Sequence, residues 1–274
     1  MDGQKIQTLY TYDQAGNVVQ ITYPDGYVLS MGYDGAGWLK TVGSFASLNY
    51  TADGQINSIR YGDGEVATYT YDSRDRPTQI RDVYGTTVEL SLNYTYDQAG
   101  NVLTENTQSY GYDALNRLTS ASGPWGTVSY TYDQTGNRVK MVTGSSTTLY
   151  SYGAFNRLLS AGGTTYAYDA NGNMASRNGT EWTYSYDYEN RLTGVKHNGV
   201  VVQQDYYDGD GNRVMQTAGN SSVVYSYQGV NVLYQKNITS GTVTKSFYAG
   251  GIQVAQMVGS GSTTSTRTPL VARC

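Results

Sequence analysis

The sequence contains very little of several residue types on which common folds and enzymes depend. It has one cysteine, Cys274, which excludes an internal disulfide framework and a cysteine-based metal cluster. It has one histidine, His197, which removes most hydrolase and metalloenzyme mechanisms. With only 3 Phe, 3 Trp and 4 Pro among 274 residues, an ordinary dry aromatic core is not expected.

Basic residues and long apolar runs are also scarce. The 18 Lys and Arg are outnumbered by 22 Asp and Glu, giving a formal net charge of −4, so the sequence argues against nucleic acid and anionic lipid as partners. No stretch approaches the roughly 18 apolar residues of a membrane span. The start, Met1-Asp2-Gly3, leads into polar sequence and not into a signal peptide, so export would need another route or an N-terminal portion that the sequence does not include. No cofactor motif is present.

What is abundant is Gly and Tyr, with 33 and 29 copies, and they recur in register. A unit beginning Tyr-Asp-x-x-Gly/Asn stands most plainly at Tyr12 and Tyr96, where the seven residues are identical. Taking the Tyr as position 1, the mean spacing is roughly 20 residues, which is typical of a repeat array. The other units start at Tyr33, Tyr50, Tyr71, Tyr112, Tyr132, Tyr152, Tyr168, Tyr186, Tyr207, Tyr227 and, in degraded form, Tyr248.

Positions 2 and 5 of the unit predict one tight turn per repeat. Position 5 is Gly, Asn or Asp from Gly16 to Asn231, and these residues enter the left-handed region at low cost. Position 2 is Asp in most units, where its carboxylate can accept hydrogen bonds from turn N–H groups. The residues assigned this structural role are Tyr12, Asp13, Gly16, Tyr96, Asp97, Gly100, Tyr112, Asp113, Asn116, Tyr132, Asp133, Gly136, Tyr168, Asp169, Gly172, Tyr186, Asp187, Asn190, Tyr207, Asp208 and Gly211.

Alternating segments flank each turn and predict strands. Ser129-Tyr130-Thr131-Tyr132 is an example, rich in Tyr, Val and Thr with a period of two. Tyrosines at alternate positions fall on one face and should stack into ladders across paired strands. Because the rings carry hydroxyls, we expect their tips to be wet. The fold class is therefore all-β, made of antiparallel hairpin repeats that form a spiral sheet.

The units Tyr112-Asp113-Ala114-Leu115-Asn116-Arg117-Leu118 and Tyr186-Asp187-Tyr188-Glu189-Asn190-Arg191-Leu192 resemble the YD repeat of the Rhs (rearrangement hot spot) family. The resemblance covers residues 10 to 258. Similar repeats occur in bacterial polymorphic toxins, wall-associated proteins, shell components of insecticidal toxin complexes and teneurins. It implies a hollow YD-repeat shell or barrel that, in toxins, encloses another polypeptide, and a secreted or cell-surface location.

The chain departs from the large members of that family. None of its prolines follows an Asp, so the self-cleavage segment of those proteins is not carried over, and no toxin domain is identified. A strip of 26 strands would have an area of roughly 2,900 Å², enough for a sphere only about 30 Å across. That is smaller than a domain of about 100 residues, so we expect a fragment of a shell, a short relative of the family or an array that works by its surface, and not a complete container.

Several chemically suggestive residues have simpler structural readings. His197 precedes an Asn-Gly turn without a partner nucleophile. Asp208-Gly209-Asp210-Gly211-Asn212 resembles the start of a calcium loop but lacks its closing Glu and is in register with the repeat. Five arginines recur beside the turns, and cross-strand ion pairs are favoured over an anion site. They are Arg117, Arg138, Arg157, Arg191 and Arg213.

The sequence therefore predicts a YD-repeat array over residues 1–258 and a Gly/Ser/Thr-rich tail over 259–274. The favoured function is a non-enzymatic scaffold that shields or presents another polypeptide, with cargo or a neighbouring shell segment as partner and no metal or cofactor. The alternative is an adhesive module that binds cell-surface glycans through exposed Tyr and Trp rings, with Trp38, Trp125 and Trp182 as the possible contacts.

Overall fold

The computed structural model describes residues 6–259 and 262–265, which form β-strands and one short 3₁₀ turn, η1 (Ala154–Asn156). Successive strands pair antiparallel through short turns, so the predicted all-β fold of antiparallel hairpins is confirmed. No helix in the described residues is long and apolar enough to cross a membrane. The chain divides into two compact units.

Among the described residues, unit 1 consists of residues 6–92, the segment Asn212–Met215 and residues 221–259 and 262–265. Its strands are β1 (Leu9–Tyr12), β2 (Val18–Thr22), β3 (Val28–Tyr33), β4 (Leu39–Val42), β5 (Ala46–Tyr50), β6 (Ile56–Tyr61), β7 (Val66–Tyr71), β8 (Pro77–Tyr84), β23 (Ser221–Gln228), β24 (Asn231–Asn237), β25 (Val243–Ala249), β26 (Ile252–Val258) and β27 (Ser262–Ser265).

Unit 2 consists of residues Asn93–Gly211 and Gln216–Asn220. Its strands are β10 (Val102–Glu105), β11 (Gln108–Tyr112), β12 (Leu118–Gly123), β13 (Gly126–Tyr132), β14 (Arg138–Thr143), β15 (Ser146–Tyr152), β16 (Leu158–Ala161), β17 (Thr164–Tyr168), β18 (Met174–Arg177), β19 (Trp182–Tyr186), β20 (Leu192–His197) and β21 (Val200–Tyr207). Two further strands, β9 (Thr87–Tyr96) and β22 (Arg213–Ala218), cross the boundary between the units.

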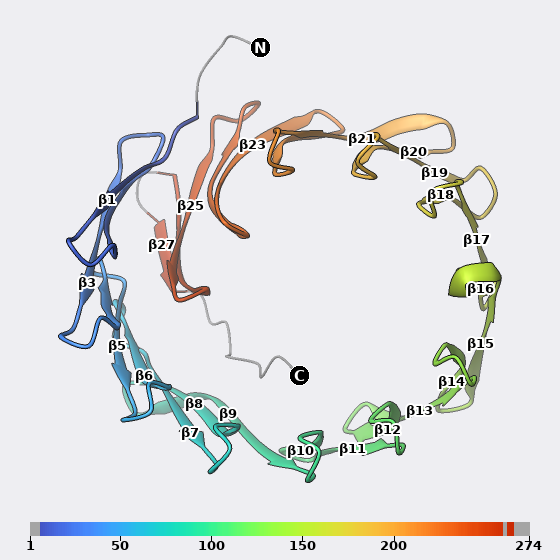
Figure 1. The fold of residues 1–274 in the computed structure, drawn as a ribbon, viewed down its shortest axis with the longest axis horizontal. Helices are drawn as coiled ribbons and strands as arrows, with labels where there is room; N and C mark the ends of the chain where they lie inside the picture. Colours follow the sequence, from blue (N-terminus) through green and yellow to red (C-terminus); the bar gives the residue numbers. More distant parts are fainter. Residues whose placement is uncertain (1–5, 260–261, 266–274) are drawn as a thin grey trace. The chain divides into compact units, whose positions relative to one another are not determined.

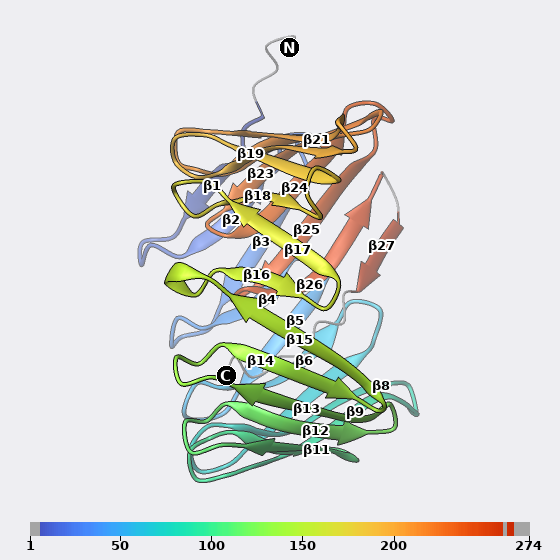
Figure 2. The ribbon, with the colours of Figure 1, turned by 90° about the vertical axis from the view of Figure 1, so that its right-hand side faces the viewer.

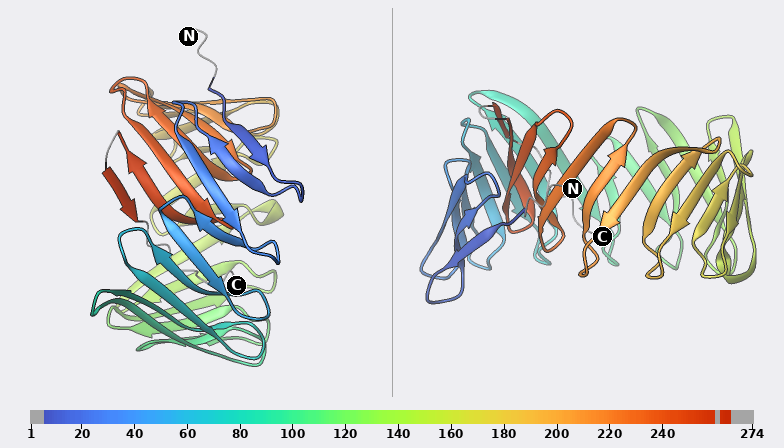
Figure 3. Two further views of the ribbon diagram at one scale, coloured as in Figure 1. Left: turned by 90° about the vertical axis from the view of Figure 1, so that its left-hand side faces the viewer. Right: turned by 90° about the horizontal axis from the view of Figure 1, so that it is seen from above.

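Unit 1 contains a dry core between its first and last strands, which lie side by side in Figures 1 and 3. The ring of Phe247 in β25 is fully buried and stacks on Phe45 with centroids 4.2 Å apart. Tyr23 packs edge-on to Phe247 at 5.7 Å and donates its hydroxyl to the Ser246 carbonyl at 3.0 Å. The sequence did not predict a dry aromatic core, and for this unit that expectation is wrong, because segments more than 200 residues apart in the sequence cover these rings.

A partly buried ion pair joins the same two segments. The side chain of Lys245 in β25 is 6% exposed and donates to the Asp25 carboxylate at 2.5 Å. Its ammonium also lies 4.8 Å from the centre of the Tyr27 ring. The turn between β2 and β3 is therefore held to β25 by charge as well as by aromatic packing.

Unit 2 is built differently, as a single layer of strands (Figure 2). Among its described hydrophobic residues, only Ala121 and Val195 are buried. Strand β13 alternates half-buried Val128, Tyr130 and Tyr132 with exposed Ser129 and Thr131. With so little buried apolar area, this unit depends on contacts between neighbouring repeats.

Strand β27 lies within the segment expected to be a tail. Its backbone pairs with β26, from Ser262 opposite Val258 to Ser265 opposite Ala255. The pairing extends the ladder beyond residue 258. The remainder of the expected tail, residues 260–261 and 266–274, lies outside the described residues.

Candidate functional site

The Asp of each repeat organises the turn that follows it. In the Tyr112 repeat, Asp113 Oδ1 accepts hydrogen bonds from the N–H groups of Leu115 at 2.9 Å and Arg117 at 3.0 Å. Its Oδ2 accepts Arg117 Nε at 2.7 Å. Asn116 takes a φ of +59° and donates its N–H to the Asp113 carbonyl. The carboxylate is therefore consumed by the turn and is not available as a catalytic group.

Positive φ occurs at eleven of the twelve predicted positions, from Gly16 (+85°) to Gly211 (+86°). The assignment at Asn231 is wrong: this residue begins β24, and Gly229 takes the positive φ at +56°. Gln228 pairs with Asn231 across a two-residue turn. The repeat there lacks the Asp, so the chain uses a shorter hairpin, which the spacing alone did not reveal.

In unit 2 two kinds of turn alternate and are linked to one another. Turns ending Gly-Asn donate from the Asn side chain to the Asn of the next turn, as Asn137 Nδ2 does to Asn156 Oδ1 at 3.0 Å. Turns ending Asn-Arg donate from the guanidinium to the carbonyl of the next Asp, as Arg117 Nη1 does to Asp133 at 3.2 Å. The same two contacts recur elsewhere in this unit, at Asn101, Asn173 and Arg191. The structural period is therefore two sequence repeats.

The tyrosine at position 1 links each repeat to the one before it. Tyr132 donates its hydroxyl to the Leu118 carbonyl at 2.7 Å. The acceptor is usually position 7 of the preceding repeat, at the start of the adjacent strand, where the register of the ladder shifts. Eleven tyrosines make this bond: Tyr33, Tyr50, Tyr71, Tyr112, Tyr132, Tyr152, Tyr168, Tyr186, Tyr207, Tyr227 and Tyr248.

This tyrosine ladder corrects the expectation of wet ring tips for those eleven residues, because the hydroxyl is bound to backbone. It also explains the preference for Tyr over Phe: a register shift frees a carbonyl, and the phenol satisfies it. Burial raises the pKa of several of these hydroxyls, among them Tyr50, Tyr71 and Tyr186. They are therefore neutral donors at ordinary pH.

The ion pairs of Arg117 and Arg191 lie within a turn, and not across two strands as had been expected. Arg117 and Arg191 pair with the Asp of their own turn, Asp113 and Asp187, each at 2.7 Å. Arg138 instead lies over two aromatic rings, 5.5 Å from the centre of Tyr130 and 4.5 Å from that of Tyr150. Position along the repeat, and not strand pairing, decides which contact an arginine makes.

The three tryptophans make separate local contacts. Trp38 packs on Tyr50 with ring centres 5.2 Å apart. Trp182 stacks on His197 at 4.2 Å. Trp125 is 50% exposed and donates its indole N–H to Gln108 at 3.2 Å. Trp38 belongs to unit 1 and the other two to unit 2, where Trp125 and Trp182 contact different residues.

The residues considered for catalysis or calcium also have local partners. His197 Nε2 lies 3.7 Å from a carboxylate oxygen of Glu181, besides its stack on Trp182. Asp208 Oδ1 accepts the N–H of Asp210 at 3.0 Å, as the aspartates of other turns do. No group of three or more His, Cys, Asp or Glu suited to a metal occurs in the part of the chain that the structure describes.

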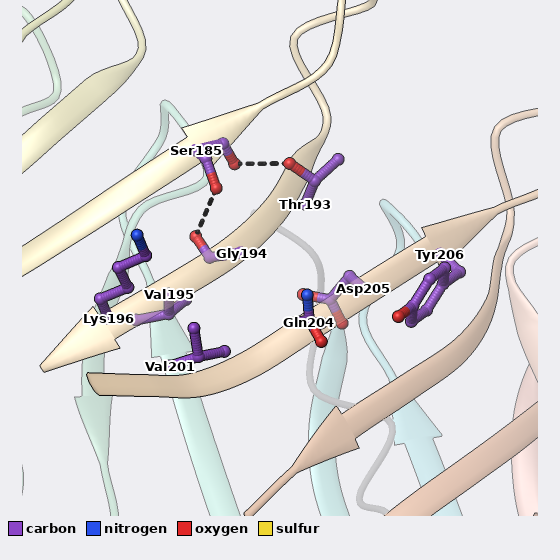
Figure 4. A pocket seen from close by; sticks show the side chains of 9 residues that line it. All are labelled: Ser185, Thr193, Gly194, Val195, Lys196, Val201, Gln204, Asp205 and Tyr206. Atoms are coloured by element: carbon purple, nitrogen blue, oxygen red, sulfur yellow. Dashed lines mark hydrogen bonds between the residues drawn. The ribbon is translucent and has the colours of Figure 1, made fainter. Parts of the chain in front are cut away.

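A pocket of about 320 Å³ lies over β19–β21 in unit 2 (Figure 4). Ser185 donates to the Gly194 carbonyl at 3.4 Å, and Thr193 donates to the Ser185 carbonyl at 3.1 Å. Asp205 is held by the amides of Gln203 and Gln216 at 2.6 and 3.0 Å. Neither histidine nor cysteine lines the pocket, and the hydroxyls of Ser185 and Thr193 are engaged with backbone carbonyls.

Comparison with known proteins places this repeat geometry among shell-forming repeats. The family model Teneurin YD-shell matches residues 101–250, and the model RHS Repeat matches residues 2–28, 12–46 and 50–87. The chain is 33% identical over 239 residues to the tRNA nuclease WapA of Bacillus subtilis (strain 168), covering 77% of this chain and 10% of WapA. It is 31% identical over 147 residues to toxin subunit YenC1 of Yersinia entomophaga, covering 43% of this chain and 14% of that protein.

Solved structures show the same fold. The chain matches one from the Photorhabdus luminescens Tc holotoxin pore with a TM-score of 0.70 and 20% identity, over 92% of this chain and 15% of that one. It matches one from the crystal structure of TcdB2-TccC3-TEV with a TM-score of 0.70 and 20% identity, over 93% and 17%. The chain thus spans only a small part of the proteins it matches.

Proposed function

The chain belongs to the teneurin YD-shell and RHS-repeat family, and on that premise we propose that it is a non-enzymatic segment of a YD-repeat β-shell that shields or presents another polypeptide. The observation that supports the proposal is that the polar side chains of the repeat make hydrogen bonds and ion pairs within the sheet and its turns. Tyrosine hydroxyls, turn aspartates and turn arginines bind neighbouring backbone or side chains. Because these side chains stabilise the sheet and its turns, few polar groups of the repeat are free to take part in catalysis.

The relatives support a structural role in a toxin-like assembly. One relative in sequence is a toxin subunit, and a solved structure with the same fold comes from a Tc toxin. The match to WapA covers a tenth of that nuclease. We propose that the matching repeat segment forms part of a protein shell and does not carry the nuclease activity. A secreted or cell-surface location, with polypeptide cargo or a neighbouring shell segment as partner, follows from the same proposal.

Shielding can be tested through Cys274, the single cysteine of the sequence. A fluorescent, unfolded peptide with one protease site is coupled there through maleimide, and its rate of cleavage is measured. The control is the same peptide coupled to a folded protein of similar size with one surface cysteine. We expect slower cleavage on the chain. Equal rates on the two carriers would contradict shielding.

The absence of nuclease activity is tested separately. The purified chain is incubated with total tRNA, and the RNA is resolved on a denaturing gel. We expect the same band pattern as with heat-denatured chain. Cleavage that depends on the folded chain would show that the segment is an enzyme.

A further inference from the structure

Arg138 has a positive charge with which no described carboxylate pairs. Where the arginine of a repeat stands at position 6, its guanidinium reaches the Asp of its own turn, as Arg117 does with Asp113 at 2.7 Å. Arg138 stands one residue later, at position 7, and Asn137 occupies position 6. The amide of Asn137 donates to Asp133 Oδ2 at 3.0 Å, so the carboxylate of this turn is already used. The ion pair expected for Arg138 is therefore absent from the described residues.

The guanidinium of Arg138 lies between two tyrosine rings on one face of the sheet. Tyr130 comes from β13 and Tyr150 from β15, the strands on either side of β14. The guanidinium carbon is 5.5 Å from the centre of the first ring and 4.5 Å from that of the second. Met141 lies opposite Tyr130 in the ladder, and all four side chains are half-buried. In Figure 2 these strands form a single layer, and no second layer of the unit covers this face.

The contacts within the chain leave this cation unsatisfied. The faces of the two rings attract it, but no described group accepts a hydrogen bond from it, and its Nε is buried without a partner. Burying part of a charged group without a counter-charge or hydrogen bonds disfavours folding. An apolar side chain such as Met could pack on the same rings without that cost. A carboxylate bound at the outer edge of the guanidinium would supply both the counter-charge and the acceptors.

We propose that Arg138, between Tyr130 and Tyr150, binds the carboxylate of an acidic side chain in an extended polypeptide, with apolar side chains of that polypeptide packed on the two rings. The proposal rests on the proposed function as a shell segment and names the chemistry of the polypeptide that the segment shields or presents. Guanidinium groups match carboxylates in charge and in planar geometry, and they keep this ability when stacked on aromatic rings.

The neighbours of Arg138 favour a polypeptide over a sugar. A sugar requires several directed polar groups around it. Here the hydroxyls of Tyr132 and Tyr152 are bound to backbone carbonyls, and that of Tyr150 points to the sulfur of Met141 at 3.8 Å. The face therefore offers one cation within an apolar surface. In an extended chain alternate side chains share a face, so an acidic residue with apolar residues two positions to either side matches this arrangement.

The probe is a fluorescent peptide of sequence Gly-Leu-Ser-Glu-Ser-Leu-Gly with both ends blocked. Its binding to the full chain is measured by fluorescence polarisation, beside the same peptide with Gln in place of Glu. We expect saturable binding of the Glu peptide and binding of the Gln peptide that is weaker by roughly 10-fold, the worth of a charge-assisted hydrogen bond. Arg138→Gln should weaken binding of the Glu peptide to a similar extent.

Lys140→Gln is the matched control. Lys140 belongs to the same strand, is exposed and stands opposite Thr131, on the face that the tyrosines do not occupy. The variant loses the same charge as Arg138→Gln and should bind the Glu peptide as the unmodified chain does. Arg138→Lys keeps the charge but not the planar group, and we expect binding between that of the unmodified chain and that of Arg138→Gln. Thermal melting checks that each variant is folded.

Three results would overturn the proposal: no saturable binding, equal binding of the Glu and Gln peptides, or equal loss in Lys140→Gln and Arg138→Gln. The two peptides are compared on the unmodified chain, so the test holds even if a variant does not fold. Polygalacturonate that binds more tightly than polyglutamate, and loses binding in Arg138→Gln, would make an acidic glycan the ligand instead. A chain that shields the peptide coupled to Cys274 but does not bind the Glu peptide contradicts only the Arg138 proposal.

Discussion

The hydroxyl of Tyr132 lies 2.7 Å from the carbonyl oxygen of Leu118, and this bond joins one repeat to the next. The two residues are 14 positions apart and lie on neighbouring strands, β13 and β12. Because the repeats of unit 2 share almost no dry core, bonds of this kind carry much of the coupling between them. Stability in such an array depends on the interfaces between neighbours.

Removing one of these hydroxyls should therefore weaken the array. Tyr132→Phe leaves the Leu118 carbonyl without its donor, and we expect a loss of about 1–2 kcal/mol. Urea denaturation followed by circular dichroism measures it. Tyr12→Phe is the matched control, because Tyr12 is exposed and no described carbonyl accepts its hydroxyl. If both variants unfold at the same urea concentration as the unmodified chain, the ladder does not stabilise the fold.

The turns give a second prediction, at Gly136. Its φ is +93°, and a Cβ added there would meet nothing within 4 Å. Any cost of Gly136→Val is therefore backbone strain, which we expect to be about 1–3 kcal/mol. Gly209→Val is the control, since Gly209 has equally open surroundings and no positive φ. Thermal melting compares the two, and equal melting temperatures would contradict the role assigned to position 5.

The fold and the turns could be predicted from the sequence because they depend on local patterns. Positive φ at Gly136 and the Asp113 turn follow from residue types at fixed spacing. The partner of each tyrosine could not be predicted, because the acceptor is a backbone carbonyl and leaves no mark in the sequence. The packing of Phe247 on Phe45 was equally hidden, since it joins residues about 200 positions apart. The only feature of the sequence that set these two residues apart was that Phe is rare, with 3 copies in the chain.

Acid should destabilise the array through its turn aspartates. The Arg76 side chain, which pairs with Asp72 at 2.6 Å, lowers the pKa of that carboxyl to about 2. Hydrogen bonds from turn amides and side chains also lower the pKa of Asp97, Asp113 and Asp187. In an unfolded chain an Asp has a pKa of about 3.9. Stability from these groups is therefore present above that pH and is lost as the pH falls through the lower folded values.

Melting temperature measured between neutral and acidic pH tests this dependence. We expect a plateau above about pH 4 and a steep fall below it. Asp72→Asn should melt lower on the plateau and lose less on acidification, because it has no carboxylate to protonate. If the melting temperature of Asp72→Asn falls with pH as steeply as that of the unmodified chain, Asp72 does not contribute to the pH dependence of stability.

The dry core of unit 1 gives the last prediction. Phe247 is fully buried between Phe45 and Tyr23, and Phe247→Ala should cost about 3–5 kcal/mol by opening a cavity. The loss should be local, because only unit 1 has this core. Backbone hydrogen exchange should become faster in β4 and β25, because the Phe247 ring packs between these two strands. It should stay unchanged in β13 and β14. Phe155→Ala is the control, since Phe155 is 89% exposed. Faster exchange throughout the chain would instead show that the two units unfold as one.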